Sequence, residues 1–130
     1  MSKNTAERDR STDLGVVRIN NEAIMTIAAA AAMEVSGVHR LGGGIGTTLH
    51  EAIFRRTHSK GVRIRMRDGD VKLSVSIVVE YGSNIPRIAD EVQDSVKRAV
   101  EKMTGLVLSA VDVVVEGVHA KITNEKERKI

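Results

Sequence analysis

Histidines are the residues of this sequence best suited to metal chemistry, because imidazole nitrogens are common ligands of zinc. The pair His50-Glu51 begins like the helical motif of zinc proteases, but Phe54 stands where that motif requires its second histidine. The other three histidines, His39, His58 and His119, share no ligand spacing along the chain. The sequence therefore predicts no native metal site.

The run Gly42–Gly46 offers backbone N–H groups that could cradle a phosphate, with Thr47 and Thr48 opening a helix behind it. A phosphate-binding loop of the G-x-x-x-x-G-K-[ST] type needs a lysine that is absent here. Gly43-x-x-Gly46 also has the form of the RNA-clamping loop of KH domains, but that loop joins two helices, whereas this run follows a predicted strand. Because glycine runs mark loops, a flexible connection is the favoured interpretation.

Other catalytic signatures are missing from the chain. It has no cysteine, which removes thiolate nucleophiles and thiolate metal ligands together. No G-x-S-x-G nucleophile elbow occurs, and Asp68 and Asp70 flank a turn glycine, where turn chemistry explains them. We therefore expect no enzymatic activity, no catalytic residue, no cofactor and no small-molecule substrate.

The chemistry that remains lies in a basic segment. Between Arg55 and Lys72 there are seven lysines and arginines against two aspartates, an excess of five positive charges in a chain whose net charge is +3. Strand alternation puts three arginines on one face and sets Lys72 opposite Arg65. The candidate residues for binding an anionic partner are Arg55, Arg56, Lys60, Arg63, Arg65, Arg67 and Lys72.

Two interpretations of this segment stay open. Like charges that face each other across strands cost stability, so a dense cluster favours an anionic partner, which could be nucleic acid, acidic lipid headgroups or an acidic protein face. Alternatively, the cations form a solvated edge that prevents strand-to-strand aggregation. The aromatic content of 2% argues against binding single strands by base stacking.

A β-hairpin must position these cations. Apolar and arginine residues alternate over Val62–Arg67, and Val71–Val79 alternates in the same way beyond the favoured two-residue turn Asp68-Gly69. That turn would pair Met66 with Val71, Ile64 with Leu73 and Val62 with Val75 on one face. Because turn and pattern agree, the register is well specified.

The other elements follow from periodicity and caps. A crossover helix between Val79 and Val111 makes those two strands parallel. We therefore expect an α+β fold, a two-layer sandwich of a mixed β-sheet with two main helices packed on one face. The remaining expected elements are strands at Val16–Ile19, Val38–Leu41 and Val111–Val118, a helix capped by Asn20 or Asn21, a short helix at Leu49–Arg56, and a helix from Ser83 or Asn84 to Thr104-Gly105.

Both main helices carry apolar stripes. The second stripe is Ile85, Ile88, Ala89, Val92, Val96, Val100 and Met103. The first helix is alanine-rich and apolar beyond its stripe, at Met25, Ala29, Ala32 and Met33. Either it is buried tightly on the sheet, or its extra apolar surface joins copies of the chain into a homo-oligomer.

The 130 residues fit one domain. We expect a disordered tail at 1–13, a single α+β domain at 14–119 and a charged C-terminal tail at 120–130. The longest apolar run is Ile27–Met33, whereas a membrane span needs about 20 residues. Since no signal segment precedes it, we expect a cytoplasmic protein that reaches the inner face of the cell membrane only through a partner.

An ordered set of short motifs resembles the alkaline shock (Gram-positive envelope stress response) protein family. It covers about Gly15 to Val118. Its pieces are Gly15–Ile19, Gly37-Val38, Glu80-Tyr81-Gly82-Ser83-Asn84-Ile85-Pro86, Val92-Gln93, Val96-Lys97, Met103-Thr104-Gly105-Leu106 and Val111-Asp112-Val113-Val114-Val115.

The resemblance implies a non-enzymatic, stress-associated binding or scaffold protein in cell-envelope homeostasis, acting at the cytoplasmic side of the membrane through a membrane-embedded protein partner. The matching residues are turns, caps and core, so no catalytic residue carries over. The arginine-rich strand is not part of the motif set. A small nucleic-acid-binding module that uses this hairpin is the alternative function.

Overall fold

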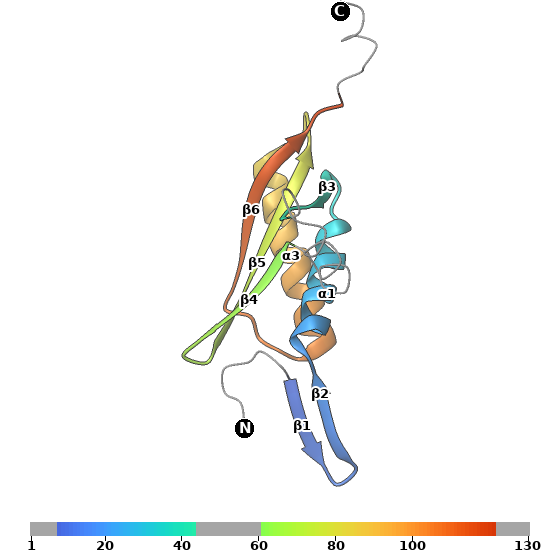
Figure 1. Cartoon of the computed structure of the whole chain (residues 1–130), viewed down its shortest axis with the longest axis vertical. Helices are drawn as coiled ribbons and strands as arrows, with labels where there is room; N and C mark the ends of the chain where they lie inside the picture. The colour runs from blue at the N-terminus through green and yellow to red at the C-terminus, as the bar shows by residue number, and fades with distance from the viewer. Residues whose placement is uncertain (1–7, 44–60, 122–130) are drawn as a thin grey trace, which may run out of the picture.

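The structure is a computed structural model that describes residues 8–43 and 61–121 (Figure 1). The predicted short helix at Leu49–Arg56 lies outside the described residues. No helix within the described ranges combines the length and apolar character needed to cross a membrane. The elements in chain order are β1 (Arg8–Thr12), β2 (Gly15–Ile19), α1 (Asn21–Met33), β3 (Val38–Leu41), β4 (Val62–Arg67), β5 (Asp70–Glu80), α3 (Ile85–Thr104) and β6 (Ala110–His119).

The main sheet is built around the long strand β5. On one edge β5 pairs with β6 in parallel, from Lys72 to Glu80. On the other edge two shorter strands pair with it antiparallel, β4 along the first half and β3 near the end. The two short strands meet at Ser76, which accepts a hydrogen bond from the Gly42 N–H and donates one to the Gly61 carbonyl, both at 2.8 Å. The parallel pairing confirms the predicted crossover.

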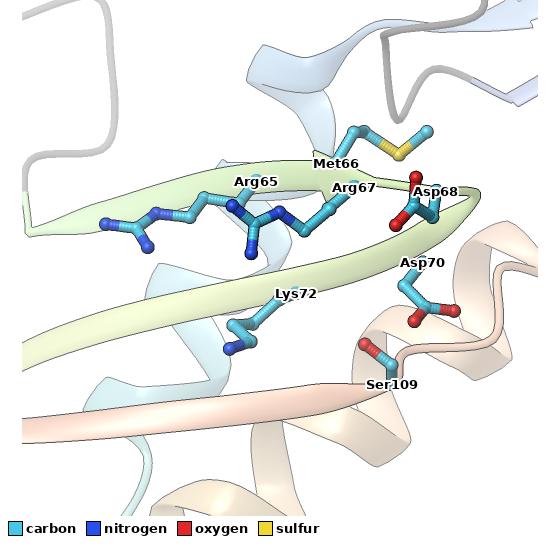
Figure 2. A pocket seen from close by; sticks show the side chains of 7 residues that line it. All are labelled: Arg65, Met66, Arg67, Asp68, Asp70, Lys72 and Ser109. Atoms are coloured by element: carbon cyan, nitrogen blue, oxygen red, sulfur yellow. The ribbon is translucent and has the colours of Figure 1, made fainter.

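The hairpin of β4 and β5 has the predicted register, with Ile64 opposite Leu73. Figure 2 shows its tip, where β5 lies between β4 and β6. At the turn Asp68 and Gly69 both have positive φ, at 53° and 86°, as the two central residues of a type I′ turn require. Leu73 is fully buried, while Ile64 is only partly buried because β4 is an edge strand.

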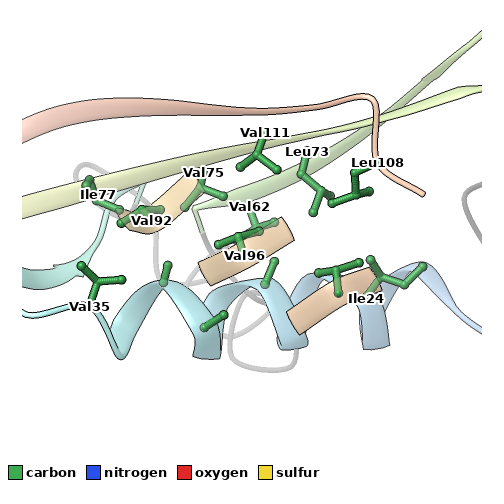
Figure 3. Close-up of a cluster of buried hydrophobic side chains, with 14 of the residues drawn as sticks. Ile24, Val35, Val62, Leu73, Val75, Ile77, Val92, Val96, Leu108 and Val111 are labelled. Atoms are coloured by element: carbon green, nitrogen blue, oxygen red, sulfur yellow. The ribbon is translucent and has the colours of Figure 1, made fainter. Parts of the chain in front are cut away.

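Both helices pack on the same face of this sheet, which confirms the two-layer α+β fold. Figure 3 shows Leu73, Val75 and Ile77 of β5 pointing toward the helices. The α3 stripe meets them with four fully buried residues: Ile88, Val92, Val96 and Val100. The core is therefore almost entirely aliphatic, as a chain with 2% aromatics requires.

Helix α1 packs beside α3, and its alanines allow the close approach. Ala28 and Ala32 are fully buried, and the Ser95 hydroxyl of α3 donates to the Ala31 carbonyl at 3.0 Å. Of the off-stripe residues, Ala32 is buried and only Met33 is mostly exposed, at 44%. Most of the extra apolar surface is thus used inside the domain, and the homo-oligomer stays a prediction.

The ends of α3 correct the predicted stripe. Ile85 in the first turn and Met103 in the last are 37% and 66% exposed, because the sheet does not extend beneath them. Thr104 is buried instead, and its hydroxyl donates to the Val100 carbonyl. Gly105 ends the helix in the left-handed conformation, at φ 83°, as predicted.

An N-terminal hairpin was not expected. The sequence analysis assigned residues 1–13 to a tail and put Val16–Ile19 in the single mixed sheet, but β1 and β2 form a separate two-stranded sheet that projects beyond α1 (Figure 1). Its turn residue Leu14 is 98% exposed. The charged β1 has no apolar alternation, so only its pairing with β2 defines it as a strand.

Candidate functional site

The sheet face opposite the helices is the candidate functional surface. On β5 the residues of this face, such as Lys72, Ser74 and Ser76, are partly exposed, whereas their neighbours on the helix face are buried. The helices described in 8–43 and 61–121 all lie on the other side. A sheet with one solvated face presents its outward side chains directly to a partner.

A row of cations occupies the β4 end of this surface. Arg63, Arg65 and Arg67 are all exposed, and Arg65 is directly opposite Lys72 in the β4–β5 register. We call these four residues the basic face. Figure 2 shows Arg65, Arg67 and Lys72 on one side of the hairpin and Met66 on the other. The alternation therefore places the cations as the sequence predicted.

Carboxylates border the basic face but leave its arginines unpaired. Among the described residues, no carboxylate oxygen forms a salt bridge with an arginine of the basic face, and Lys72 lies 3.9 Å from Asp112 of β6. Asp70 is opposite Arg67 in the register. The candidate residues Arg55, Arg56 and Lys60 lie outside the described part of the chain.

A hollow of about 400 Å³ adjoins the hairpin tip. Cations, carboxylates and a hydroxyl line it together, so it suits a polar, charged segment better than an apolar ligand. Its lining residues are Arg65, Met66, Arg67, Asp68, Asp70, Lys72 and Ser109 (Figure 2).

A second polar cluster lies at the opposite end of β5, and the sequence analysis missed it. The Glu80 carboxylate contacts the Nδ1 atoms of His39 at 2.9 Å and of His119 at 3.2 Å. The two imidazole rings are stacked, with centroids 3.8 Å apart. The hydrogen bond from His39, followed by that from His119, lowers the pKa of the Glu80 carboxyl from its ordinary value.

The start of the glycine run is occupied by a carboxylate. Glu116 of β6 reaches across the face, and its side chain fills the space where a Cβ on Gly42 would stand. The Gly43 N–H donates to the Glu116 Oε1 at 3.0 Å. A negative charge here would repel a phosphate, which argues against an anion cradle at the start of the run.

Comparisons with known proteins agree with the motif resemblance. The chain matches the model of the alkaline shock protein family, described as having a cell envelope-related function, over residues 9–120. The uncharacterized protein YqhY of Bacillus subtilis is 34% identical over 107 residues, 82% of this chain and 79% of its own. YloU of the same organism is 31% identical, covering 87% of this chain and 94% of its own.

A relative from Streptococcus pyogenes carries a name with functional content. It is a stress response regulator gls24 homolog, 27% identical over 127 residues, which are 97% of this chain and 71% of that protein. The match to the family model spans nearly every described element, from β1 to the end of β6. The chain therefore belongs to the alkaline shock protein family, whose function is related to the cell envelope.

Proposed function

We propose that this protein is a non-enzymatic binding or scaffold protein in cell-envelope homeostasis, and that its basic face docks an acidic segment of a protein partner. The family description and the stress-related name of the S. pyogenes relative support the setting. The basic face itself carries the docking role. Arg65 and Lys72 are like charges directly opposite each other, an arrangement that costs stability unless an anion relieves it.

An acidic peptide segment fits this surface better than nucleic acid does. Asp68, Asp70 and Asp112 lie at its edge, where they would repel the long row of phosphates that a duplex presents. A side chain-sized carboxylate can instead bind between the cations and avoid these residues. Arginine guanidinium groups also favour carboxylates through paired hydrogen bonds.

The envelope-related function of the family supports a partner in the membrane. Such a partner would hold the protein at the cytoplasmic side of the membrane, with the basic face of β4 and β5 as the contact. Acidic residues of the partner, close to the membrane surface, would be the docked segment. Anionic lipid headgroups near the same cations would add to the attraction.

The test measures direct binding of three anionic probes to the full-length chain. The probes are a fluorescent poly-glutamate peptide, vesicles rich in anionic lipid, and a DNA duplex with a matching single-stranded RNA. The test variant changes Arg63, Arg65 and Arg67 to Ser. The matched control changes Arg87, Arg98 and Lys102 to Ser, which removes the same charge from exposed positions on α3.

We expect the wild type and the α3 control to bind the peptide, and the β4 variant to lose that binding. Each lost contact with a charged partner should be visible as a weaker salt dependence. Preferential binding of DNA or RNA with the same dependence on the arginines would replace this proposal with the nucleic-acid module. If all three proteins bind every probe alike, the face is a solvated edge and the docking role is wrong.

A charge reversal separates binding from folding. Arg65→Glu places a carboxylate opposite Lys72, so the free energy of unfolding should rise by about 0.2–1 kcal/mol. Peptide binding should nevertheless fall, because the new charge repels the probe. In cells, a photo-crosslinking residue at position 65 should yield an adduct in the membrane fraction. An adduct found only with soluble nucleic acid would contradict the protein partner.

A further inference from the structure

Three strands that are distant in the sequence converge on one polar cluster at the end of the sheet. His39 comes from β3, Glu80 from β5 and His119 from β6. One potential ligand atom from each residue lies within 4.8 Å of the other two. We propose that His39, Glu80 and His119 form a binding site for a divalent transition-metal ion of the zinc class.

The backbone holds the three residues side by side. Glu80 is the register partner of His119 in the parallel β5–β6 pair. The Tyr81 N–H donates to the His119 carbonyl, and the Glu80 N–H donates to the Gly37 carbonyl, both at 2.9 Å. The sheet therefore fixes the Cα positions of the ligands before any ion binds.

Two register irregularities, one on each edge of β5, bring the histidines to the face of Glu80. In β3 the pairing moves from Leu41–Ile77 and Arg40–Val78 directly to Val38–Val79, so His39 is the extra residue. Without it, His39 would pair with Val79 and point toward the helices. Bulges of this kind re-aim side chains and are common next to functional sites.

The β6 irregularity acts in the same way. The pairing moves from Ile77–Val115 to Val78–Gly117, so Glu116 is the extra residue. In an unbroken register Glu80 would face Val118, and His119 would lie beyond the end of the pairing. Two independent bulges thus produce one cluster, which a simple hydrogen bond between exposed side chains does not require.

The donor set selects the class of ion. Two imidazole nitrogens and one carboxylate oxygen suit zinc, nickel, cobalt or copper, whereas calcium and magnesium prefer oxygen ligands alone. Ligand bonds of about 2.0–2.2 Å in a tetrahedral site put donor atoms about 3.3 Å apart. The distances of 2.9 and 3.2 Å from the Glu80 oxygens to the two histidines are already close to this value.

Small side-chain rotations would complete the site. A bound ion lies in the plane of each imidazole ring, so the two stacked rings must tilt apart. The side chains of His39, Glu80 and His119 are 32%, 47% and 40% exposed, so no core packing opposes the movement. Three protein ligands leave a coordination position for water or for a ligand from a partner.

The charge of the site favours a cation. The lowered pKa keeps the Glu80 carboxyl ionised near neutral pH, and the carboxylate can only accept hydrogen bonds. Each Nδ1 in contact with it therefore carries a proton in the ion-free state. Binding through these atoms releases those protons, which makes affinity fall as the pH is lowered.

This site is independent of the basic face, and its test uses a tag-free, full-length chain treated with a chelator. Zinc is titrated by calorimetry, and cobalt by its visible absorption. The variants are His39→Ala, His119→Ala and Glu80→Gln. The matched control is the double variant His50→Ala, His58→Ala, which removes the other two of the four histidines.

We expect one zinc ion per chain with a micromolar dissociation constant. Affinity should fall by about 10-fold or more in each cluster variant and stay unchanged in the control. Amide NMR shifts on adding zinc should centre on residues 37–40, 80 and 119, which keeps the test decisive even if an alanine variant does not fold. No saturable binding, or binding that depends on His50 and His58, would overturn the site.

Discussion

Gly37 and Ile88 lie in direct contact, and this contact links the core to the polar end of the sheet. The Ile88 side chain occupies the space where a Cβ on residue 37 would stand, and Gly37 has φ +102°. The Gly37 carbonyl also accepts the Glu80 N–H, which sets the start of β3 beside the end of β5. A glycine is required here for both space and backbone conformation.

Gly37→Ala should therefore destabilise the fold by about 1–3 kcal/mol from backbone strain, with a further cost from overpacking against Ile88. Gly82→Ala is the matched control, because Gly82 also has a positive φ of 92° but nothing lies within 4 Å of an added Cβ. Urea denaturation of both variants measures the difference. Equal losses would show that Ile88 can move aside without cost.

Val96→Ala should lower the free energy of unfolding by about 1–3 kcal/mol, because it removes buried methyl groups and leaves a cavity. Val96 is fully buried between α3 and the sheet. Met103→Ala is the control from the same predicted stripe, and since Met103 is 66% exposed it should change stability by about 0.5 kcal/mol or less. Similar losses in chemical denaturation would contradict the observed orientation of the helix.

The sequence could predict the elements whose signals are local. Alternation over Val62–Arg67 and the Asp68-Gly69 turn determine the hairpin register, and that register alone places Arg65 opposite Lys72. The α3 stripe is equally local, except at its ends, where exposure depends on how far the sheet reaches. The basic face was predictable for the same reason, since only strand periodicity is needed to align its arginines.

The cluster of His39, Glu80 and His119 could not be predicted because it depends on tertiary pairing. Its members are 39 and 41 residues apart, and two bulges decide which face each histidine takes. Spacing rules for metal ligands describe one helix or one loop and contain no information about parallel register. A parallel pairing of the ends of β5 and β6, had it been known, would have been the usable signal.

Glu101 should make stability depend on pH. Its carboxylate accepts hydrogen bonds from the Lys97 Nζ at 2.7 Å and the Leu108 N–H at 2.8 Å, and these two contacts, in that order, lower the pKa of Glu101. A lowered pKa in the folded state gives stability that is present above the ordinary value of 4.5 and is lost as the pH falls through the folded value.

Glu101→Gln should consequently be less stable than the wild type at pH 7, and the difference should shrink as acid protonates the wild-type carboxyl. Urea denaturation between pH 7 and about pH 3 measures this. Glu91→Gln, which breaks an exposed pair with Arg87 and no backbone contact, is the control and should cost less at pH 7. A gap between Glu101→Gln and wild type that stays constant with pH would contradict the role of the ionised carboxylate.

The two asparagines at the starts of the helices should respond differently to replacement. The Asn84 side chain accepts the Arg87 N–H at 3.0 Å and caps α3, whereas Asn20 stands at the same position before α1 without a side-chain cap bond. Asn84→Ala should cost about 1 kcal/mol, and Asn84→Asp should retain most of the stability because aspartate can accept the same bond. Thermal and urea unfolding of the purified variants measure both changes.

Asn20→Ala should cost distinctly less, because no hydrogen bond from the side chain to the helix is lost. The comparison also tests why Asn84 belongs to the motif stretch from Glu80 to Pro86. If the motif serves the fold, Asn84→Ala should weaken stability while peptide and zinc binding by the folded fraction stay unchanged. Equal costs at the two caps, or a loss of binding without a loss of stability, would show that Asn84 does something other than begin the helix.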